Sequence, residues 1–281
     1  MIRRPLPWYR RLRFSLSHQL TLPIHHLANR FPHCELGFAS LEISRIACRY
    51  APLAGRRAVQ ISDLHLDRYH RRHDMLVETI AELGPDWIFV TGDLLNMPSG
   101  LPHAFRFLSH LRSLAPVFLI LGNHDHSSGV PVSVFADLSD RHKLSFLLNQ
   151  VVFVRAGKGE LGIVGLDDPS THRADLRCLP SPTPERFTVI LAHAANVVDH
   201  LEDRHAGDLV LCGHSHGGQW RLPLIAPFWL PYGCNGHAGG HFQHNGRRLY
   251  VNRGLGWSVL PARLGCPPEI LVIDWTENEE G

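Results

Sequence analysis

The stretch DWIFVTGD, residues 86–93, decides the fold class. Its apolar run is short and uninterrupted, which is typical of a strand buried on both faces of a parallel sheet. Gly92 and Asp93 end the run with a turn residue and a carboxylate. The preceding residues 71–83 carry apolar side chains at helical spacing and stop at Gly84-Pro85. This part of the chain therefore predicts a helix followed by a buried strand.

The same alternation continues on both sides of this unit. Residues 56–63 predict another buried strand, 104–114 a helix and 115–125 a third strand. Strand, helix and strand at these lengths predict right-handed βαβ units around a parallel core. Residues 41–50 alternate between apolar and polar positions, and we expect them to form the hairpin partner of the 56–63 strand.

The second half of the chain predicts more strands and fewer helices. Residues 151–168 read as two strands around a Gly157-Lys158-Gly159 turn. Further strands are expected at 187–194, 207–216, 247–256 and 269–275, with one helix near 195–204. We expect a second sheet packed on the first, with helices on both outer faces. The predicted fold class is α/β, a four-layer α/β/β/α sandwich of two mixed sheets.

Composition narrows the class of protein. The chain has 281 residues, of which 44% are hydrophobic and 19% charged, and this suits one globular enzyme domain. Its net charge of +2 gives no reason to expect nucleic acid as a partner. The six cysteines form no CxxC pair, which favours a reducing compartment and a cytoplasmic location. The 21 histidines invite a search for metal-ligand spacing.

The N-terminal segment, residues 1–40, differs from the expected domain at 41–281. It is basic and has no acidic residue before Glu35. Polar residues interrupt its apolar runs, so it fits neither a signal peptide nor a membrane-spanning helix. Aromatic residues lie between its arginines, and two interpretations stay open: contact with an anionic membrane surface, or a loosely docked tail.

Side chains with metal-ligand chemistry follow several of the predicted strands. They are Asp63, His65, Asp93, Asn123, His193, His214 and His216. In open α/β sheets ligands bind outside the carboxyl ends of strands, so these side chains are expected at one rim. Oxygen and imidazole donors without thiolate suit Mn, Fe, Zn or Mg. They are too many for one tetrahedral ion and suit two ions that share a carboxylate, as in phosphate-ester hydrolysis.

Glycines flank these ligands at positions 92, 122, 213 and 217. A glycine has no Cβ, so it allows a sharp turn out of a strand and a close approach of metal or substrate to the backbone. We expect the glycines to let the loops carry the ligands inward.

The motifs ISDLH, TGD, LGNHD, AH and GHSHGGQ together resemble those of the calcineurin-like metallophosphoesterase superfamily, over about residues 56–220. The later stretch LYVNRGLGWSVLPARLGCPPEI resembles a branch of bacterial phosphodiesterases that includes the chlamydial-type UDP-2,3-diacylglucosamine hydrolase. The resemblance implies a metal-dependent phosphoric ester or pyrophosphate hydrolase.

The resemblance also implies a role for each ligand. Asp93 would bridge two divalent ions, with Mn favoured over Fe, Zn and Mg. The other ligands divide into Asp63, His65 and His216 for one ion and Asn123, His193 and His214 for the other. His124 would be the catalytic residue that holds the phosphate and protonates the leaving oxygen, a role that imidazole can fill.

Three neighbouring residues have open roles. Asp125 either orients His124 or caps the following loop, and we favour the cap. Asn96 stands where many relatives carry a second acid, which puts the support of His124 in doubt. Arg253 either clamps a substrate phosphate or has a structural role.

The expected substrate is phosphorylated and lipid-linked, such as UDP-2,3-diacylglucosamine of lipid A biosynthesis. The apolar residues 221–233 either pack over the second sheet or form a lip for acyl chains or membrane. The alternatives are a general phosphodiesterase acting on nucleotides or small diesters and, least favoured because every ligand position is filled, a non-catalytic metal-binding scaffold. We expect peripheral contact with the inner face of the cytoplasmic membrane and no obligate protein partner.

Overall fold

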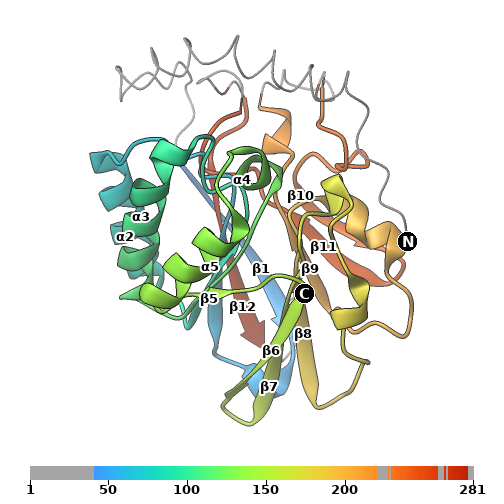
Figure 1. Cartoon of the computed structure of the whole chain (residues 1–281). Coiled ribbons are helices and arrows are strands. Elements are labelled where there is room, and N and C mark those ends of the chain that lie inside the picture. The colour runs from blue at the N-terminus through green and yellow to red at the C-terminus, as the bar shows by residue number, and fades with distance from the viewer. Residues whose placement is uncertain (1–40, 220–226, 228, 259–262, 264, 278–281) are drawn as a thin grey trace.

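Two six-stranded mixed sheets pack face to face in the computed structural model, which describes residues 41–219, 227, 229–258, 263 and 265–277 (Figure 1). The first sheet has the order β1 (Glu42–Arg49), β12 (Glu269–Thr276), β2 (Arg57–Ile61), β3 (Trp87–Thr91), β4 (Val117–Ile120) and β5 (Ser145–Phe146). The second has the order β10 (Gly240–His244), β11 (Arg247–Val251), β9 (Leu209–Cys212), β8 (Arg186–Leu191), β7 (Gly159–Gly165) and β6 (Gln150–Ala156).

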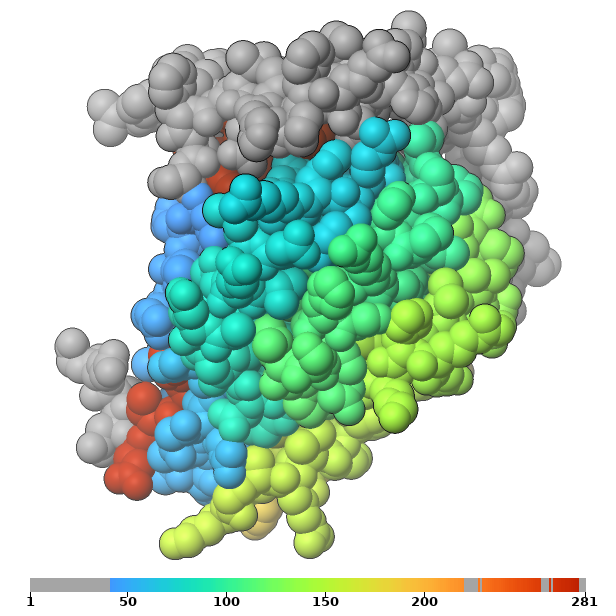
Figure 2. All heavy atoms as spheres, turned by 90° about the vertical axis from the view of Figure 1, so that its left-hand side faces the viewer, coloured from blue at the N-terminus to red at the C-terminus, as the bar shows by residue number. Residues whose placement is uncertain are grey.

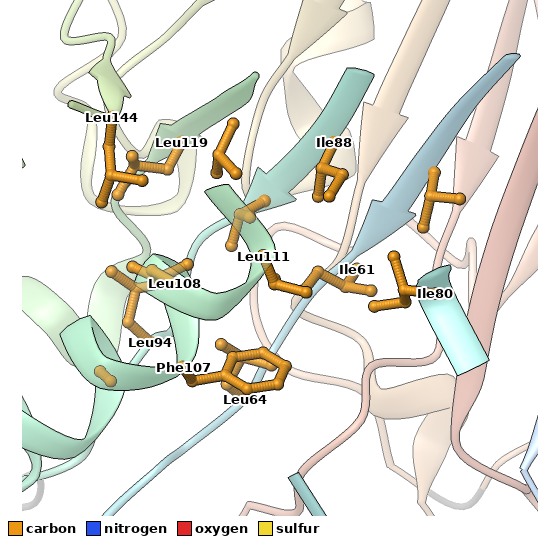
Figure 3. Packing of buried hydrophobic residues seen from close by; sticks show 14 of the residues in the cluster. Ile61, Leu64, Ile80, Ile88, Leu94, Phe107, Leu108, Leu111, Leu119 and Leu144 are labelled. Atoms are coloured by element: carbon orange, nitrogen blue, oxygen red, sulfur yellow. The ribbon is translucent and has the colours of Figure 1, made fainter. Parts of the chain in front are cut away.

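Apolar layers hold the sandwich together. Phe89 and Phe118 of the first sheet meet Ile163 and Leu191 of the second in the layer between the sheets. Helices α2 (Arg71–Leu83), α3 (Leu101–Arg112) and α5 (Val132–Arg141) cover the outer face of the first sheet. Figure 2 looks at this side and shows the cyan and green residues of these helices over the sheet. Figure 3 shows the core beneath them, where Phe107, Leu108 and Leu111 of α3 lie against Ile61, Ile88 and Leu119.

The fourth layer is built differently from the other helical layer. The 3-10 helices η4 (Leu176–Cys178) and η5 (Ala195–His200) place Leu176, Val197 and Val198 against the outer face of the second sheet. The predicted four-layer sandwich is confirmed, and its second outer layer consists of 3-10 helices and loops in the described residues. The helix expected near 195–204 is one of these 3-10 helices.

Most predicted elements are confirmed, and α2 has the predicted bounds. A capping box between His70 and His73 begins α2, and Gly84 in the left-handed region (φ 61°) ends it. The β6–β7 hairpin turns at the expected glycine pair. The sequence analysis did not predict α5, β5 (Ser145–Phe146) or β10, and the strand expected at 115–125 ends at Ile120 and is followed by the short helix α4 (Asn123–Ser127). β5 and β10 have too few apolar residues to stand out from loops.

The expected pairing of residues 41–50 with 56–63 is wrong. β1 pairs in parallel with β12, from Glu42 opposite Glu269 to Arg49 opposite Thr276. β12 then pairs antiparallel with β2. β12 is buried along almost its whole length, whereas β1 has several exposed positions. A strand buried on both faces is stabilised by neighbours on both edges, so β12 takes the inner position and β1 becomes the edge.

Two sequence-based expectations lie wholly or partly outside the described residues. The N-terminal segment 1–40 is outside them, so the proposed division at residue 41 stays a prediction. Of the stretch 221–233, only residue 227 and residues 229–233 are described. Within the described part of the chain, no helix has both the length and the apolar character needed to cross a bilayer.

Candidate metal centre

Loops that follow β2, β3, β4, β8 and β9 meet at the junction of the two sheets. Backbone hydrogen bonds connect these loops directly. The amide of Asp63 donates to the carbonyl of Gly92 at 3.0 Å, and the amide of His65 donates to the carbonyl of Asp93 at 3.0 Å. The amide of Gly213 donates to the carbonyl of His193 at 3.0 Å. The structure thus brings together ligand candidates that lie far apart in the sequence.

The ligand candidates form two groups with one shared member. Asp63, His65, Asp93 and His216 offer ligand atoms that all lie within 4.8 Å of one another, and so do Asp93, His193 and His214. Asn123 joins the second group, since its Oδ1 lies 3.1 Å from Nε2 of His193. Every titratable member is buried. The two groups coincide with the two ligand sets that the family resemblance implies, and Asp93 is the residue they share.

The backbone of the ligand loops is left-handed at several residues that are not glycine. Asp63 has φ 52°, Asp93 has φ 53° and His214 has φ 68°. Such backbone is uncommon outside glycine, and it clusters at functional sites. The expected role of the glycines is confirmed at two places. A Cβ on Gly213 would lie 2.3 Å from Asp63 Oδ2, and one on Gly122 would lie 2.2 Å from Asp93 Oδ1.

Hydrogen bonds at the outer ring nitrogens fix three of the four imidazoles in the two groups. Nδ1 of His193 lies 2.8 Å from the carbonyl oxygen of Thr91, and Nε2 of His214 lies 2.8 Å from that of Tyr232. A carbonyl only accepts, so these ring nitrogens carry the protons. Nδ1 of His65 likewise donates to Oδ1 of Asn96 at 2.7 Å. In the neutral rings the inner nitrogens therefore carry no proton, and each can bind a metal.

The inner ring nitrogens of the two groups point at one another. Nε2 of His193 lies 3.1 Å from Nδ1 of His214, and Nε2 of His65 lies 3.0 Å from Nε2 of His216. In the neutral rings of His193 and His214 both inner nitrogens carry lone pairs, and these repel at this distance unless a cation lies between them. The donor set is entirely nitrogen and oxygen, which fits divalent Mn, Fe, Zn or Mg. The residues present thus fit the divalent metals that the fold implies.

The two buried carboxylates have opposite pKa shifts. Burial raises the pKa of Asp63 to about 6. Burial would also raise the pKa of Asp93, but the positive charges on His193 and His124 hold it well below its usual range. Both carboxylates can be negatively charged near neutral pH, and this negative charge favours cation binding at the centre.

His124 belongs to neither ligand group. Its backbone amide donates to Oδ1 of Asp93 at 2.8 Å, and its ring stands edge-on to the ring of His65 with centroids 4.7 Å apart. The side chain is half-buried, as is that of Asn123, whereas the Asp and His ligands are buried. It therefore lies at the rim of the centre, where a substrate can reach it.

The three neighbours with open roles have defined contacts. Asp125 accepts hydrogen bonds from the amides of Gly122 and Leu94 at 2.9 Å each, and from the amide of Leu95 at 3.3 Å. Its role in these contacts is structural, but the carboxylate caps the preceding turn and the loop after β3 and not the following loop that the sequence suggested. Asn96 contacts His65 and not His124 in the hydrogen bonds described above, and its amide group donates to Asp67 at 3.2 Å.

Arg253 is engaged in ion pairs. Its Nη2 lies 3.0 Å from a carboxylate oxygen of Glu42 and 3.0 Å from one of Glu269, and its side chain is 14% exposed. These contacts give Arg253 a structural role between β1, β12 and the loop after β11. The phosphate clamp considered from the sequence would have to compete with both carboxylates.

The described end of the apolar stretch 221–233 borders the metal centre. Trp229 and Tyr232 are 64% and 69% exposed. Because the carbonyl of Tyr232 binds His214, this residue is fixed beside the second ligand group.

The sequence analysis missed the carbonyls of Thr91 and Tyr232 as orienting groups, since every residue has a carbonyl and no motif marks these two. Asn96 could be singled out from the sequence, because it stands where the family pattern has an acid.

The sequence of this chain is similar to those of known proteins. The family model described as calcineurin-like phosphoesterase matches residues 56–218. The uncharacterized metallophosphoesterase YkuE of Bacillus subtilis is 33% identical over 225 residues, covering 78% of each chain. Phosphodiesterase YaeI of Escherichia coli is 29% identical over 250 residues, 86% of this chain and 90% of YaeI. UDP-2,3-diacylglucosamine pyrophosphatase LpxG of Chlamydia trachomatis is 29% identical over 289 residues, covering 80% of this chain and 85% of LpxG.

Proposed function

The chain belongs to the calcineurin-like phosphoesterase family and is a metal-dependent hydrolase, and from this premise we propose that it cleaves the pyrophosphate bond of a lipid-linked sugar nucleotide such as UDP-2,3-diacylglucosamine. The observation that carries the hydrolytic part is the sharing of Asp93 by two buried ligand groups. Two divalent ions bound there would lower the pKa of water and stabilise negative charge on phosphate oxygens.

The residues of the chain have separate tasks in this proposal. Asp63, His65 and His216 hold one ion, Asn123, His193 and His214 hold the other, and Asp93 bridges them. The carboxylates of Asp63 and Asp93 offset half of the charge of two divalent ions, and the residual positive charge attracts phosphate. His124 at the rim contacts the phosphate and donates a proton to the leaving oxygen. We favour Mn among the metals that the nitrogen and oxygen donors accept.

The lipid-linked substrate rests on two observations. A pyrophosphatase named for UDP-2,3-diacylglucosamine is 29% identical to this chain. Trp229 and Tyr232 expose aromatic side chains beside the metal centre, where acyl chains could lie. Such a substrate resides in a membrane, so we also propose peripheral contact with the inner face of the cytoplasmic membrane. The basic residues 1–40 would supply part of this contact.

The test compares two substrate classes under identical conditions. Purified protein is incubated with Mn²⁺ and UDP-2,3-diacylglucosamine in detergent, and UMP release is measured by chromatography. The same preparation is assayed with bis(p-nitrophenyl) phosphate, and His124→Ala serves as the blank for both assays. We expect UMP release well above the blank. Good hydrolysis of the simple diester without UMP release refutes the lipid assignment.

The second candidate is a general phosphodiesterase for nucleotides or small diesters. It is favoured by the 29% identity to phosphodiesterase YaeI over 90% of that relative. The diester arm of the same experiment measures it. A protein that binds two ions yet hydrolyses neither substrate would point to the scaffold alternative.

A further inference from the structure

Arg263 places a guanidinium group inside the protein, next to the metal centre but outside both ligand groups. The residue is 6% exposed. Its Nε donates to the carbonyl of Gly256 at 2.8 Å. Its Nη2 donates to the carbonyls of Arg253 and Gly254 at 2.8 and 3.1 Å. One side chain therefore binds successive carbonyls of the loop formed by residues 253–256.

This loop lies directly on the backbone of the first ligand loop. The amide of Leu255 donates to the carbonyl of Ser62 at 3.0 Å, and the amide of Gly256 donates to that of Asp63 at 2.7 Å. A Cβ on Gly254 would lie 2.6 Å from Cβ of Asp63. The contact is too close for any side chain, so a shift of the loop moves Asp63. Asp63 has left-handed backbone (φ 52°), which is uncommon for residues other than glycine.

Arg263 also lies against His216, another ligand of the same group. Nη2 of Arg263 is 3.5 Å from Nδ1 of His216. The other three imidazoles of the two groups place their outer ring nitrogen on an oxygen acceptor. The outer nitrogen of His216 instead faces a guanidinium nitrogen, which can only donate.

Burial of this charge is costly for the fold. A buried guanidinium normally has a carboxylate partner, and no carboxylate lies within ion-pair distance of Arg263 in the described part of the chain. Backbone carbonyls are its main partners, and Sγ of Cys266 lies 3.9 Å from its Nη1. An apolar side chain of similar size would fill the space at lower cost, but it could not bind the carbonyls of residues 253–256.

We propose that Arg263 is a positioning residue for the ion held by Asp63, His65 and His216. It fixes the 253–256 loop, and this loop fixes the backbone of Asp63. It does not touch the second ligand set of Asn123, His193 and His214 in any contact described here, so its effect is selective for one ion.

The test is a titration of metal-free protein with Mn²⁺, followed by calorimetry and by the electron paramagnetic resonance of free Mn²⁺. Arg263→Gln is expected to weaken one of the two binding positions by about 10- to 100-fold, as typical for loss of an outer partner of a metal ligand. The other position should keep its affinity. Excess Mn²⁺ should restore kcat, because the reacting groups themselves are intact.

Arg248→Gln is the matched control. Arg248 donates to the carbonyl of Ala47 at 2.7 Å, so its loss also removes an arginine–carbonyl bond, but at the opposite end of β11 from the ligands. Both Mn²⁺ affinities should stay at their wild-type values. Near-UV circular dichroism and cooperative unfolding check that each variant is folded. If Arg263→Gln does not fold, Arg263→Lys is titrated, and an intermediate loss at one position is expected.

The results separate this inference from the proposed function on which it rests. A wild-type protein that binds only one ion refutes the dinuclear centre. A wild-type protein that binds two ions, with a folded Arg263→Gln that matches it, overturns only the role of Arg263. Equal weakening of both positions also overturns it, since that result indicates a general structural role. If Arg263→Gln does not fold, an Arg263→Lys variant with wild-type Mn²⁺ affinity at both positions also overturns the role of Arg263.

Discussion

The backbone amide of His124 donates a hydrogen bond to Oδ1 of Asp93 at 2.8 Å. The other carboxylate oxygen of Asp93 lies 3.3 Å from Nε2 of His193 and 3.6 Å from Nε2 of His65. Asp93 thus faces both ligand groups and the loop of the proposed acid at once. The expected effects of several substitutions follow from this position.

His124→Ala should lower kcat by about 10²- to 10⁴-fold, the usual range for loss of a general acid. The variant keeps the backbone amide that binds Asp93, so both ions should remain bound. Steady-state kinetics with a simple diester and metal analysis of the same sample check this. Loss of metal in parallel with loss of turnover would show that the imidazole is a ligand instead.

Asp93→Asn and Asp63→Asn should differ in the number of ions they affect. Asp93 is shared by both groups, so its neutral variant should weaken both Mn²⁺ positions. Asp63 belongs to one group only, and its variant should weaken one position. Metal content after dialysis and two-site titration measure the difference. Equal effects of the two variants would contradict the bridging role of Asp93.

Asn96→Ala should weaken Mn²⁺ binding by about 10- to 100-fold at the position that includes His65. The reason is that Oδ1 of Asn96 accepts the Nδ1 proton of His65 at 2.7 Å. Titration with Mn²⁺ and the kcat at saturating Mn²⁺ are measured together. A lower kcat with unchanged metal affinity would show that Asn96 supports His124, the role considered for an acid at this position.

His73 should make the stability of the protein sensitive to acid. Its Nδ1 accepts the amide proton of His70 at 2.9 Å, and burial, together with the charge of Arg72, lowers the pKa of His73 from 6.5 to about 3. The unfolded chain therefore binds a proton below pH 6.5 that the folded protein does not. Stability from this group is present above pH 6.5 and falls as the pH decreases towards 3.

His73→Gln tests this directly, because glutamine can keep the capping box without titrating in this range. Between pH 7.5 and pH 5, the free energy of unfolding of the wild type should fall by about 2 kcal/mol more than that of the variant. Urea unfolding at both pH values measures the difference. His200 is exposed, and His200→Gln serves as the control, whose free energy of unfolding should change with pH as in the wild type. If the free energy of unfolding of His73→Gln also changes with pH as in the wild type, the prediction is wrong.

The sequence was sufficient to predict elements whose pattern is local. Residues 87–90 are all apolar and are followed by Thr91 and Gly92, and α2 combines helical spacing with a glycine stop. Each pattern is local and is enough to predict the element. The partner of β1 could not be predicted in this way. Pairing with β12 depends on which strand needs two neighbours, and the two strands are separated by almost the whole described chain.

The metal centre, like the fold, was predicted from the sequence only in part. The sequence alone determined which side chains with ligand chemistry follow the strands, because a motif such as GHSHGG fixes residue type and spacing at once. Only the tertiary structure decided which ring nitrogen each imidazole turns inward, since that depends on the carbonyls of Thr91 and Tyr232 and on Asn96. It likewise decided that Arg253 pairs with carboxylates and that Arg263 binds the 253–256 loop. Hydrogen bonds to backbone groups, and contacts between loops far apart in the sequence, leave no recognisable motif in the sequence. They form only when the two sheets pack together.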